Sequence, residues 1–528
     1  MIKRTKKLLH TASPLFYGCL TGIICGVVIS LFLVCAKIVL SFSFGLYDSD
    51  RTPLFVVCIL ILVILSCLIM AVMQTLYPSC KGSGIPLAEG AARGMLSVKW
   101  LRSAATLIAD SLLSFLCGLP LGSEGPSIGV GGLIGEGLGR AAKKPVEFRR
   151  YLITGGASSG LAIAFNAPLT GVAFALEETH RRFSPGILLA AFSSVIPAAL
   201  VSQLMFWGLG QIPYLAGLGV RAGSALLPYL SQTSYSNAMD LLTVGGIAAL
   251  CGIGCALFAA LFNASIFGLN KLFGKIKSRT LRLLPAFILT AVCGLCLAQS
   301  VGSGEATFEG VSLSTATWLL ITLFVLRFVM TALASGSGAT GGLFLPMIAI
   351  GGILGTLAAK ASVAAGMDNS FAPNIIMLCI SAFFAASARA PISALAMAIE
   401  LTASFSNLLP CAIAVAISTA IAGVMRSSPL YERMMEDLYK STQKHICGEV
   451  ITISGVIPDG SYLCGRRIRD VLWPYNSLVT ELDRGGQIIV PDGETVLEEN
   501  DRLTVRAENI ESEFFTEQLK DYIQHNLQ

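Results

Sequence analysis

Seven apolar stretches, each long enough to cross a bilayer, most constrain how this chain can fold. A helix needs about 20 apolar residues to span the hydrocarbon core of a membrane. Of the 528 residues 54% are hydrophobic and only 13% are charged, against about 25% charged in typical soluble domains. We therefore predict an all-α multi-pass membrane protein that contacts lipid. The stretches are 16–42, 53–76, 185–208, 238–269, 283–300, 315–334 and 405–425.

Basic residues are distributed unevenly among the segments that join these stretches. Cytoplasmic loops of membrane proteins carry an excess of Lys and Arg. The two loops that we expect outside hold only Arg51 and Arg221, so both termini are predicted to be cytoplasmic. The net charge of +5 then reflects orientation in a membrane, and no nucleic-acid partner is expected. The basic segments are 1–10, 140–150, 181–182 and 271–282, and the expected outside loops are 45–53 and 209–236.

The fifteen cysteines indicate neither a disulfide framework nor a metal site. Most lie inside apolar stretches, where a free thiol behaves as a small hydrophobic group. The chain has only four histidines and lacks the paired-ligand spacing of metal sites. It also lacks a phosphate-binding loop and a catalytic Cys/His arrangement. We expect no metal, no cofactor and no enzymatic activity.

The chain changes character after about residue 430, where membrane-length apolar runs end. Short apolar segments that alternate with glycine turns predict β-strands. We expect a short helix at Gly465–Leu472 and a longer one at 508–522. The segment 448–528 is thus predicted to be a small soluble α+β domain behind a membrane domain at 1–441. The predicted strands are Val450–Ser454, Ser477–Leu482, Gln487–Val490 and Arg502–Val505.

The membrane part contains an internal repeat. The segment that starts at Ala167-Pro168 and runs to Glu177 has a counterpart that starts at Ala390-Pro391, 223 residues later, and runs to Glu400. A glycine pattern that starts at Gly131 recurs from Gly351, 220 residues later. Nearly equal offsets favour a duplicated unit, with repeats at about 60–205 and 240–425. Transporters built from such repeats place their site at the repeat interface, on broken helices.

Three glycine-rich segments interrupt the apolar stretches, and each has the composition of a chain break followed by a helix start. Broken backbone at membrane depth is tolerated only inside protein or beside an aqueous cavity. Helix N-termini carry free N–H groups and about half a positive charge, so three that converge would form an anion site. The segments are Gly82-Ser83-Gly84-Ile85-Pro86, Gly122-Ser123-Glu124-Gly125-Pro126 and Gly341-Gly342-Leu343-Phe344-Leu345-Pro346.

In order and spacing, these segments resemble the signature motifs of the CLC chloride channels and proton/chloride exchangers. The resemblance covers about residues 15–440 and includes Ser-Pro-Leu-Tyr at Ser428–Tyr431. It implies an inverted repeat, a homodimer in which each subunit has its own pathway, and chloride and protons as the transported ions. It also implies a multi-pass protein of a bacterial inner membrane. The leading hypothesis is chloride/proton exchange, and the alternative is a passive chloride channel on the same fold.

The resemblance assigns the anion site to four residues. The hydroxyl groups of Ser83 and Tyr431 would coordinate the central anion, together with the backbone N–H groups of Leu343 and Phe344. Serine at position 83 goes with chloride preference in the family. Taken alone, Ser83 could equally be a helix cap and Tyr431 an interfacial aromatic residue.

Two glutamates would carry protons. A carboxylate in an apolar, glycine-bounded segment is costly unless it has a function. By resemblance, Glu124 is the gating glutamate, whose ionised side chain competes with the anion for its place. The family usually has Arg or Lys where this chain has Ser123, so its pH dependence does not carry over. Glu178 matches the internal proton-transfer glutamate of exchangers, although a salt bridge with Arg181 or Arg182 is an open alternative.

Three further charged residues lie inside apolar runs. Asp110 has no partner that the sequence identifies. For Arg327 and Lys37 we expect internal pairing or a side chain that reaches the membrane surface.

The tail at about 448–510 resembles the TrkA-C (RCK-C) module of bacterial ion transporters, on Gly465–Leu472, Ser477–Thr480, Arg484-Gly485-Gly486 and the segments after them. This resemblance implies regulation by a cytosolic small molecule such as a nucleotide; a dimerisation or folding module is the alternative. A potassium channel is also conceivable with such a tail. However, Thr243-Val244-Gly245-Gly246 is only a fragment of a potassium filter.

Overall fold

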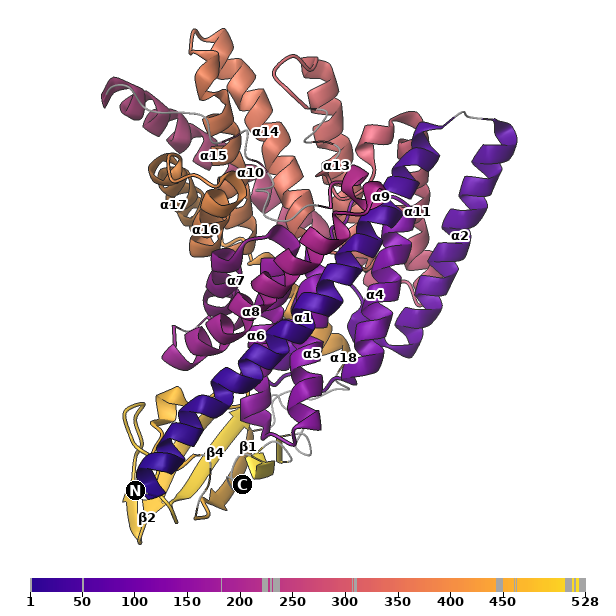
Figure 1. Ribbon diagram of the computed structural model, residues 1–528. Helices are drawn as coiled ribbons and strands as arrows, with labels where there is room; N and C mark the ends of the chain where they lie inside the picture. Colours follow the sequence, from indigo (N-terminus) through magenta and orange to yellow (C-terminus); the bar gives the residue numbers. More distant parts are fainter. Residues whose placement is uncertain are drawn as a thin grey trace.

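The computed structural model describes most of the chain. Backbone is described for 2–49, 52–181, 183–220, 227, 230, 238–305, 307, 311–442, 450–459, 461, 463–508, 515–516 and 519–521, and side chains for the same residues except 2–13 and 238–241. Figure 1 shows a large body of tilted helices and a small sheet domain, in yellow, beneath one end of it.

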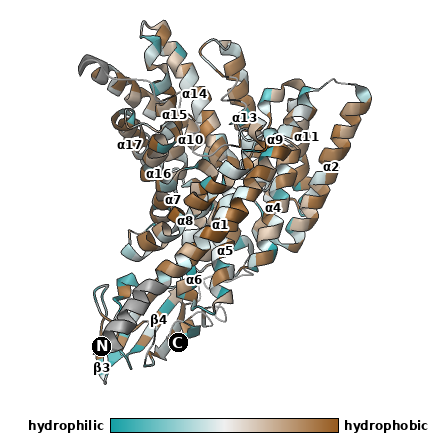
Figure 2. Ribbon diagram, in the orientation of Figure 1, coloured by the Kyte–Doolittle hydropathy of each residue, from teal (hydrophilic) through white to brown (hydrophobic). Residues whose placement is uncertain are grey.

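Within the described residues, eight helices are long and apolar enough to cross a membrane. Six coincide with predicted stretches, and brown apolar residues dominate them in Figure 2. The prediction did not include α14 and α15, although their hydropathy is no lower than that of α11. The predicted stretch 405–425 forms only a 17-residue helix, α17 (Leu408–Val424). The eight are α1 (Ile2–Asp48), α2 (Pro53–Leu76), α8 (Pro185–Leu209), α10 (Ala238–Gly274), α11 (Arg279–Cys296), α13 (Thr317–Ser337), α14 (Phe344–Ala364) and α15 (Ala372–Ala388).

Shorter helices lie between these spans, and the three glycine-rich segments each end where a helix begins. Helix α3 begins at Ile85, α5 at Glu124 and α14 at Phe344, so the predicted chain breaks are confirmed. Proline suits these positions, because the backbone N–H that it lacks would have no acceptor within the first turn of a helix. The shorter helices are α3 (Ile85–Ala92), α4 (Trp100–Leu116), α5 (Glu124–Ala141), α6 (Val146–Phe165), α7 (Pro168–Phe174), the π-helical turn Ala175–Thr179, α9 (Pro213–Gly217), α16 (Pro391–Thr402) and α18 (Leu430–Thr442).

The internal repeat is visible in the order α5–α8, which recurs as α14–α17. The residues that follow α6 and α15, Asn166 and Arg389, have a left-handed backbone with φ of 52° and 64°. In both places an alanine of similar backbone conformation comes next (φ of −131° and −122°), and a helix that starts with proline follows it. The same chain geometry at the same offset supports two copies of one unit. The boundaries given for the repeats and for the two domains remain predictions.

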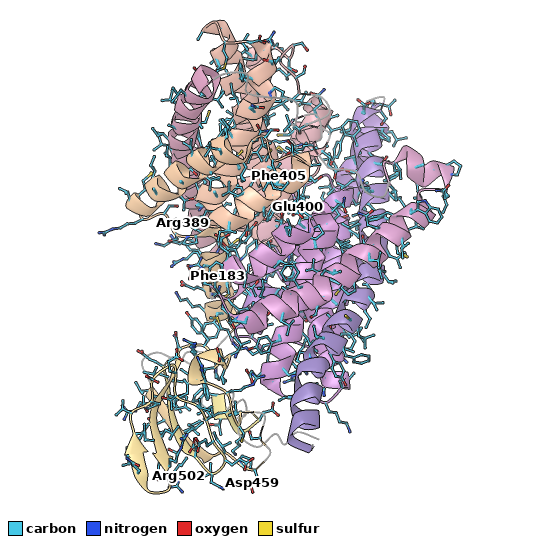
Figure 3. The ribbon with its side chains drawn as sticks, turned by 60° about the vertical axis from the view of Figure 1, so that its left-hand side comes forward. Phe183, Arg389, Glu400, Phe405, Asp459 and Arg502 are labelled. Atoms are coloured by element: carbon cyan, nitrogen blue, oxygen red, sulfur yellow. The ribbon has the colours of Figure 1, made fainter. Side chains whose placement is uncertain are left out.

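Each repeat completes a helix start in the other. The carboxylate of Glu400, on α16, accepts hydrogen bonds from the N–H groups of Leu169 and Thr170 at 2.7 Å, in the first turn of α7. Glu177, beyond α7, accepts from Ile392 N at 2.9 Å and Ser393 N at 2.7 Å, in the first turn of α16. Figure 3 shows Glu400 where the orange and purple halves meet. These reciprocal caps tie the two repeats together.

Glycine lets paired helices within each repeat approach closely. A Cβ atom on Gly131 of α5 would lie 2.1 Å from the Gly156 carbonyl oxygen of α6. In the second repeat, a Cβ atom on Gly355 of α14 would lie 2.6 Å from the Ile376 Cα of α15. No Cβ fits at such distances, so backbone packs directly against backbone and leaves little space between these helices.

The soluble domain is a four-stranded antiparallel sheet in the order β1-β4-β2-β3. All four strands were predicted, and they are β1 (Val450–Val456), β2 (Ser477–Arg484), β3 (Gln487–Ile489) and β4 (Arg502–Glu508). Of the short helix predicted at Gly465–Leu472, only the 3₁₀ helix Ile468–Asp470 forms. Gly465 and Arg466 instead exchange backbone hydrogen bonds with Leu497. Of the helix predicted at 508–522, residues 515–516 and 519–521 are helical, and 509–514, 517–518 and 522 lie outside the described residues.

The reciprocal caps give a first prediction. The substitution Glu400→Ala leaves two first-turn N–H groups of α7 without their acceptor, which should cost about 1–2 kcal/mol. We expect a lower melting temperature of the detergent-purified protein, and a similar loss for Glu177→Ala. The control is Glu481→Ala, on an exposed position of β2. Equal melting temperatures for all three variants would contradict the capping role.

Candidate functional site

The three glycine-rich segments meet at one place. Gly122 and Gly342 exchange two backbone hydrogen bonds, with N···O distances of 2.8 and 2.6 Å, and so form an isolated antiparallel bridge between the two repeats. Gly341 N donates to the Gly82 carbonyl oxygen at 3.2 Å, which adds the third segment. The starts of α3, α5 and α14 therefore converge, as the sequence predicted for an anion site.

The segments touch so closely that only glycine fits at the contacts. A Cβ atom on Gly125 would lie 2.1 Å from the Ser83 carbonyl oxygen and 2.8 Å from the Gly342 Cα. One on Gly84 would lie 2.6 Å from the Gly125 carbonyl oxygen, and Gly84 also has a φ of +81°, which other residues rarely adopt. The glycines hold the three helix starts at backbone contact.

Glu124 is the first residue of α5, and its side chain lies within this junction. The residue is 2% exposed, and its carboxylate accepts hydrogen bonds from the backbone N–H groups of Glu124 and Leu345. Its Oε2 has no hydrogen-bond partner among the described residues. A Cβ atom on Gly122 would lie 2.1 Å from that oxygen, and one on Gly342 would lie 2.9 Å from it. The Glu124 carboxyl group thus occupies the place to which the helix dipoles point.

Ser83 and Tyr431 bring two hydroxyl groups to the same region. Both residues are fully buried, and neither hydroxyl has a hydrogen-bond partner among the described residues. The Ser83 hydroxyl lies 2.6 Å from the Cβ position of Gly125. Tyr431, at the start of α18, interacts electrostatically with the carboxyl groups of Glu178 and Glu124. Buried hydroxyls without partners are costly, so the site is suited to a bound acceptor such as an anion.

Leu343 and Phe344 start helix α14. Backbone N–H groups in the first turn of a helix have no acceptor within it. The Phe344 ring packs between Phe165 and Phe384, with ring centroids 4.8 and 4.2 Å away. These contacts hold the first turn of α14, and hence its N–H groups, at the junction.

Glu178 lies in the π-helical turn Ala175–Thr179, and its side chain is 1% exposed. Neither carboxylate oxygen has a hydrogen-bond partner within the described part of the chain. The salt bridge considered with Arg181 does not form, because Arg181 pairs with Glu432 at 2.7 Å; Arg182 lies outside the described residues. Arg93 instead donates to the backbone carbonyls of Glu178 and Thr179 at 2.6 and 2.7 Å. The carboxyl group is thus positioned through its backbone, and its oxygens are left unbonded.

The sequence analysis missed Glu89. It lies on α3, is fully buried, and has two carboxylate oxygens without a hydrogen-bond partner among the described residues. It interacts electrostatically with Glu178 and with Tyr431. The sequence signal that could have identified Glu89 is an acidic residue five positions after Gly84, in a helix whose other residues are apolar or small. Glu178, Glu89, Tyr431 and Glu124 are thus all buried in one region of the membrane domain, within electrostatic range of one another.

The analysis also missed a second Gly-Ser-Gly segment, Gly302-Ser303-Gly304. It lies 220 residues after Gly82-Ser83-Gly84, the offset already noted for Gly131 and Gly351. Here the fully buried Arg327 donates to the carbonyls of Val301 and Gly302 at 3.1 and 3.0 Å. The internal pairing expected for Arg327 is confirmed. Because the Arg327 guanidinium donates hydrogen bonds to these carbonyls, the second Gly-Ser-Gly segment has different surroundings from the first.

Two further charged residues are embedded in the apolar runs. Asp110 is fully buried, and neither of its carboxylate oxygens has a hydrogen-bond partner among the described residues. Lys37 donates to the Gly219 carbonyl at 3.2 Å. The Ser123 side chain makes no capping hydrogen bond at the start of α5. In the part of the chain that the structure describes, no group of three His, Cys, Asp or Glu residues could hold a metal ion.

Comparison with known proteins identifies relatives along most of the chain. The family model described as voltage gated chloride channel matches residues 66–423, and the TrkA-C domain matches 456–510. The H(+)/Cl(-) exchange transporter ClcA of Vibrio parahaemolyticus is 29% identical over 397 residues, 74% of this chain and 81% of the relative. The ClcA of Vibrio cholerae is 29% identical over 443 residues, 81% of this chain and 90% of the relative.

Solved structures show the same fold. The structure of a slow cyanobacterial Cl⁻/H⁺ antiporter superposes with a TM-score of 0.70 at 26% identity, over 81% of this chain and 99% of that one. A CLC-type fluoride/proton antiporter superposes with a TM-score of 0.62 at 20% identity, over 78% and 95%. The chain is therefore a multi-pass membrane protein that belongs to the CLC family and carries a C-terminal TrkA-C domain.

Proposed function

We propose that the protein is a secondary active transporter that exchanges chloride for protons. The observation that carries this proposal is the Glu124 carboxylate at the convergence of three helix starts, close to two buried hydroxyls without partners. The names of the relatives, H(+)/Cl(-) exchange transporters at 29% identity, support the same reaction. We expect transport and no enzymatic activity.

In the anion step, the Ser83 and Tyr431 hydroxyls and the N–H groups of Leu343 and Phe344 bind chloride. All four donors are neutral, so the attraction comes from hydrogen bonds and helix dipoles instead of a full positive charge. Such a site holds the ion weakly enough to release it, which transport requires. Fluoride appears in the name of one structural neighbour, and that neighbour shares the fold alone.

In the proton step, Glu124 competes with the anion. When ionised, its carboxylate fills the positive junction and excludes chloride. When protonated, it loses this attraction and leaves the junction to the anion. Glu178 receives protons from the cytoplasmic side and passes them toward Glu124 through the region of Glu89 and Tyr431. A proton and a chloride ion thus use the same junction in turn, which couples their opposite movements.

The wider assembly follows from the family. We propose a homodimer in a bacterial inner membrane, with a separate pathway in each subunit and both termini in the cytoplasm. The basic segments support this orientation, because cytoplasmic loops carry an excess of Lys and Arg. The TrkA-C domain would then lie in the cytoplasm, where it binds a small molecule, such as a nucleotide, that regulates transport.

The gating role of Glu124 predicts how its neutral variant behaves. Glutamine cannot ionise, so Glu124→Gln in liposomes should carry chloride with no proton movement and with a rate that no longer depends on pH. Chloride flux and proton flux are measured together with a chloride electrode and a pH electrode. Unchanged pH-dependent chloride transport in this variant would disprove the gating role.

A proton-coupling assay on the wild type and on Glu178→Gln distinguishes an exchanger from a passive channel. In wild-type liposomes, an imposed chloride gradient should drive protons uphill, because the two ions are coupled. Glu178→Gln should abolish this proton movement and leave chloride flux within a few-fold of wild type. A wild-type protein that conducts chloride without moving protons would be a passive channel. Glu177→Gln is not a suitable control, because Glu177 caps α16.

The anion site predicts weaker chloride binding without the Tyr431 hydroxyl. A hydrogen bond to a charged group contributes about 1.5–3 kcal/mol, so Tyr431→Phe should weaken chloride affinity about tenfold or more. Titration calorimetry of the purified protein with chloride measures this change. Tyr214→Phe, on the exposed helix α9, serves as the matched control. Equal chloride affinities for the two variants would show that the Tyr431 hydroxyl does not bind the anion.

A further inference from the structure

The soluble domain contacts the membrane domain at the start of helix α6. Glu147, in its first turn, has a side chain only 1% exposed. Its carboxylate pairs with Arg466 at 3.0 Å and accepts the N–H of Leu472 at 3.3 Å. Val146 N donates to the Asp521 carboxylate at 2.6 Å. A buried carboxylate without its cation would be strongly unfavourable, so Glu147 holds the two domains together only while Arg466 is in place.

Arg150, one turn further along α6, links the same loop to helix α3. The residue is 4% exposed. On one side it donates to the carbonyls of Leu472 and, at 3.1 Å, Trp473 in the soluble domain. On the other side it donates to the carbonyl of Ala92 at 2.6 Å. Ala92 is the last residue of α3, whose first turn forms part of the anion junction.

The end of α3 in turn holds the segment that carries Glu178. Arg93, directly after Ala92, donates to the backbone carbonyls of Glu178 and Thr179. The soluble domain also reaches this segment directly, because the Leu472 side chain packs in one apolar cluster with Val172 and Ala175. Two independent routes therefore lead from the loop 466–473 to the π-helical turn.

The π-helical turn is a suitable element to receive such a signal. Single π turns are rare and are frequently found at functional sites. Within the described residues, the Glu178 carboxylate makes no hydrogen bond of its own. The position of this carboxylate therefore depends on its backbone, and that backbone depends on Arg93.

We propose that the loop 466–473 positions Glu178 and thereby lets the soluble domain control the proton route separately from the anion route. Arg466 and Arg150 are positioning residues: neither touches the transported ions, and both act through the ends of α6 and α3. A ligand that moves the soluble domain would release Arg150 and shift the π-helical turn. This inference rests on the proposed function, because it takes Glu178 as the proton-transfer group.

The test compares two neighbouring arginines in the full-length protein. Arg466→Ala removes the partner of Glu147, whereas Arg467→Ala removes an exposed pair with Glu494 inside the soluble domain. In liposomes, Arg466→Ala should reduce proton flux by about threefold or more and change chloride flux by less than about twofold. Arg467→Ala should behave like wild type, and Arg466→Lys should restore most of the proton flux. Proton and chloride fluxes that fall together, or do not change, would overturn the proposal.

Hydrogen exchange provides a second readout that does not depend on proton transport. In the wild type, the N–H groups of Gly94 and Met95 donate to the carbonyls of Ala91 and Gly90 at 3.0 and 2.7 Å. We expect these amides and those of 175–180 to exchange faster in Arg466→Ala than in wild type or Arg467→Ala. Unchanged exchange would disprove the mechanical link. A wild type without proton transport but with this exchange difference would refute the proposed exchange function and leave the link standing.

Discussion

The hydrogen-bonded pair Gly122 and Gly342 joins the two halves of the membrane domain at the point where three helices begin. Because neither residue has a side chain, the loops approach to backbone contact and exchange two hydrogen bonds at 2.8 and 2.6 Å. The helix starts then face one small volume, and their dipoles add there. A Cβ atom on Gly125 would lie 2.1 Å from the Ser83 carbonyl oxygen, and one on Gly342 would lie 2.6 Å from Gly125 N, so a larger residue at either position would force the loops apart. The anion site, the placement of Glu124 and the proposed competition all depend on this contact.

The duplicated architecture is symmetric in its backbone and asymmetric in its chemistry. Both copies have a Gly-Ser-Gly segment, a glycine-packed helix pair and a capped helix start. In the first copy, the Gly-Ser-Gly segment precedes α3 and lies close to Glu124 and Tyr431. In the second copy, the buried Arg327 donates hydrogen bonds to the carbonyls of Val301 and Gly302. Both copies contribute a helix start to the proposed anion site, but only the first contributes its Gly-Ser-Gly segment to it.

Much of the fold was predictable because its signals are local. Glycine and proline mark chain breaks wherever they occur in apolar sequence, and equal offsets mark a repeat, so the three helix starts were predictable; that they converge became visible only in the structure. Helices α14 and α15 were missed although they are as apolar as α11, which was predicted. The helix predicted at Gly465–Leu472 is reduced to one 3₁₀ turn because its first residues pair with Leu497, a contact that local propensity does not contain.

The site was predicted less completely, because it combines residues from distant segments. Glu124, Ser83 and the start of α14 lie in recognisable motifs, and the structure brings them together. Glu89 lies outside any motif, and its proximity to Glu178 comes only from the packing of α3 against the π-helical turn. The contact of Arg150 with Ala92 and Leu472 joins three separate parts of the chain. Such a contact has no sequence signature.

The reciprocal caps have a consequence for how the protein is made. Helix α7 lacks the acceptor for its first N–H groups until Glu400 has been synthesised, about 230 residues later. Until then these N–H groups need another acceptor, such as water or a neighbouring group. The reciprocal caps between the repeats can therefore form only after most of the second repeat has been made.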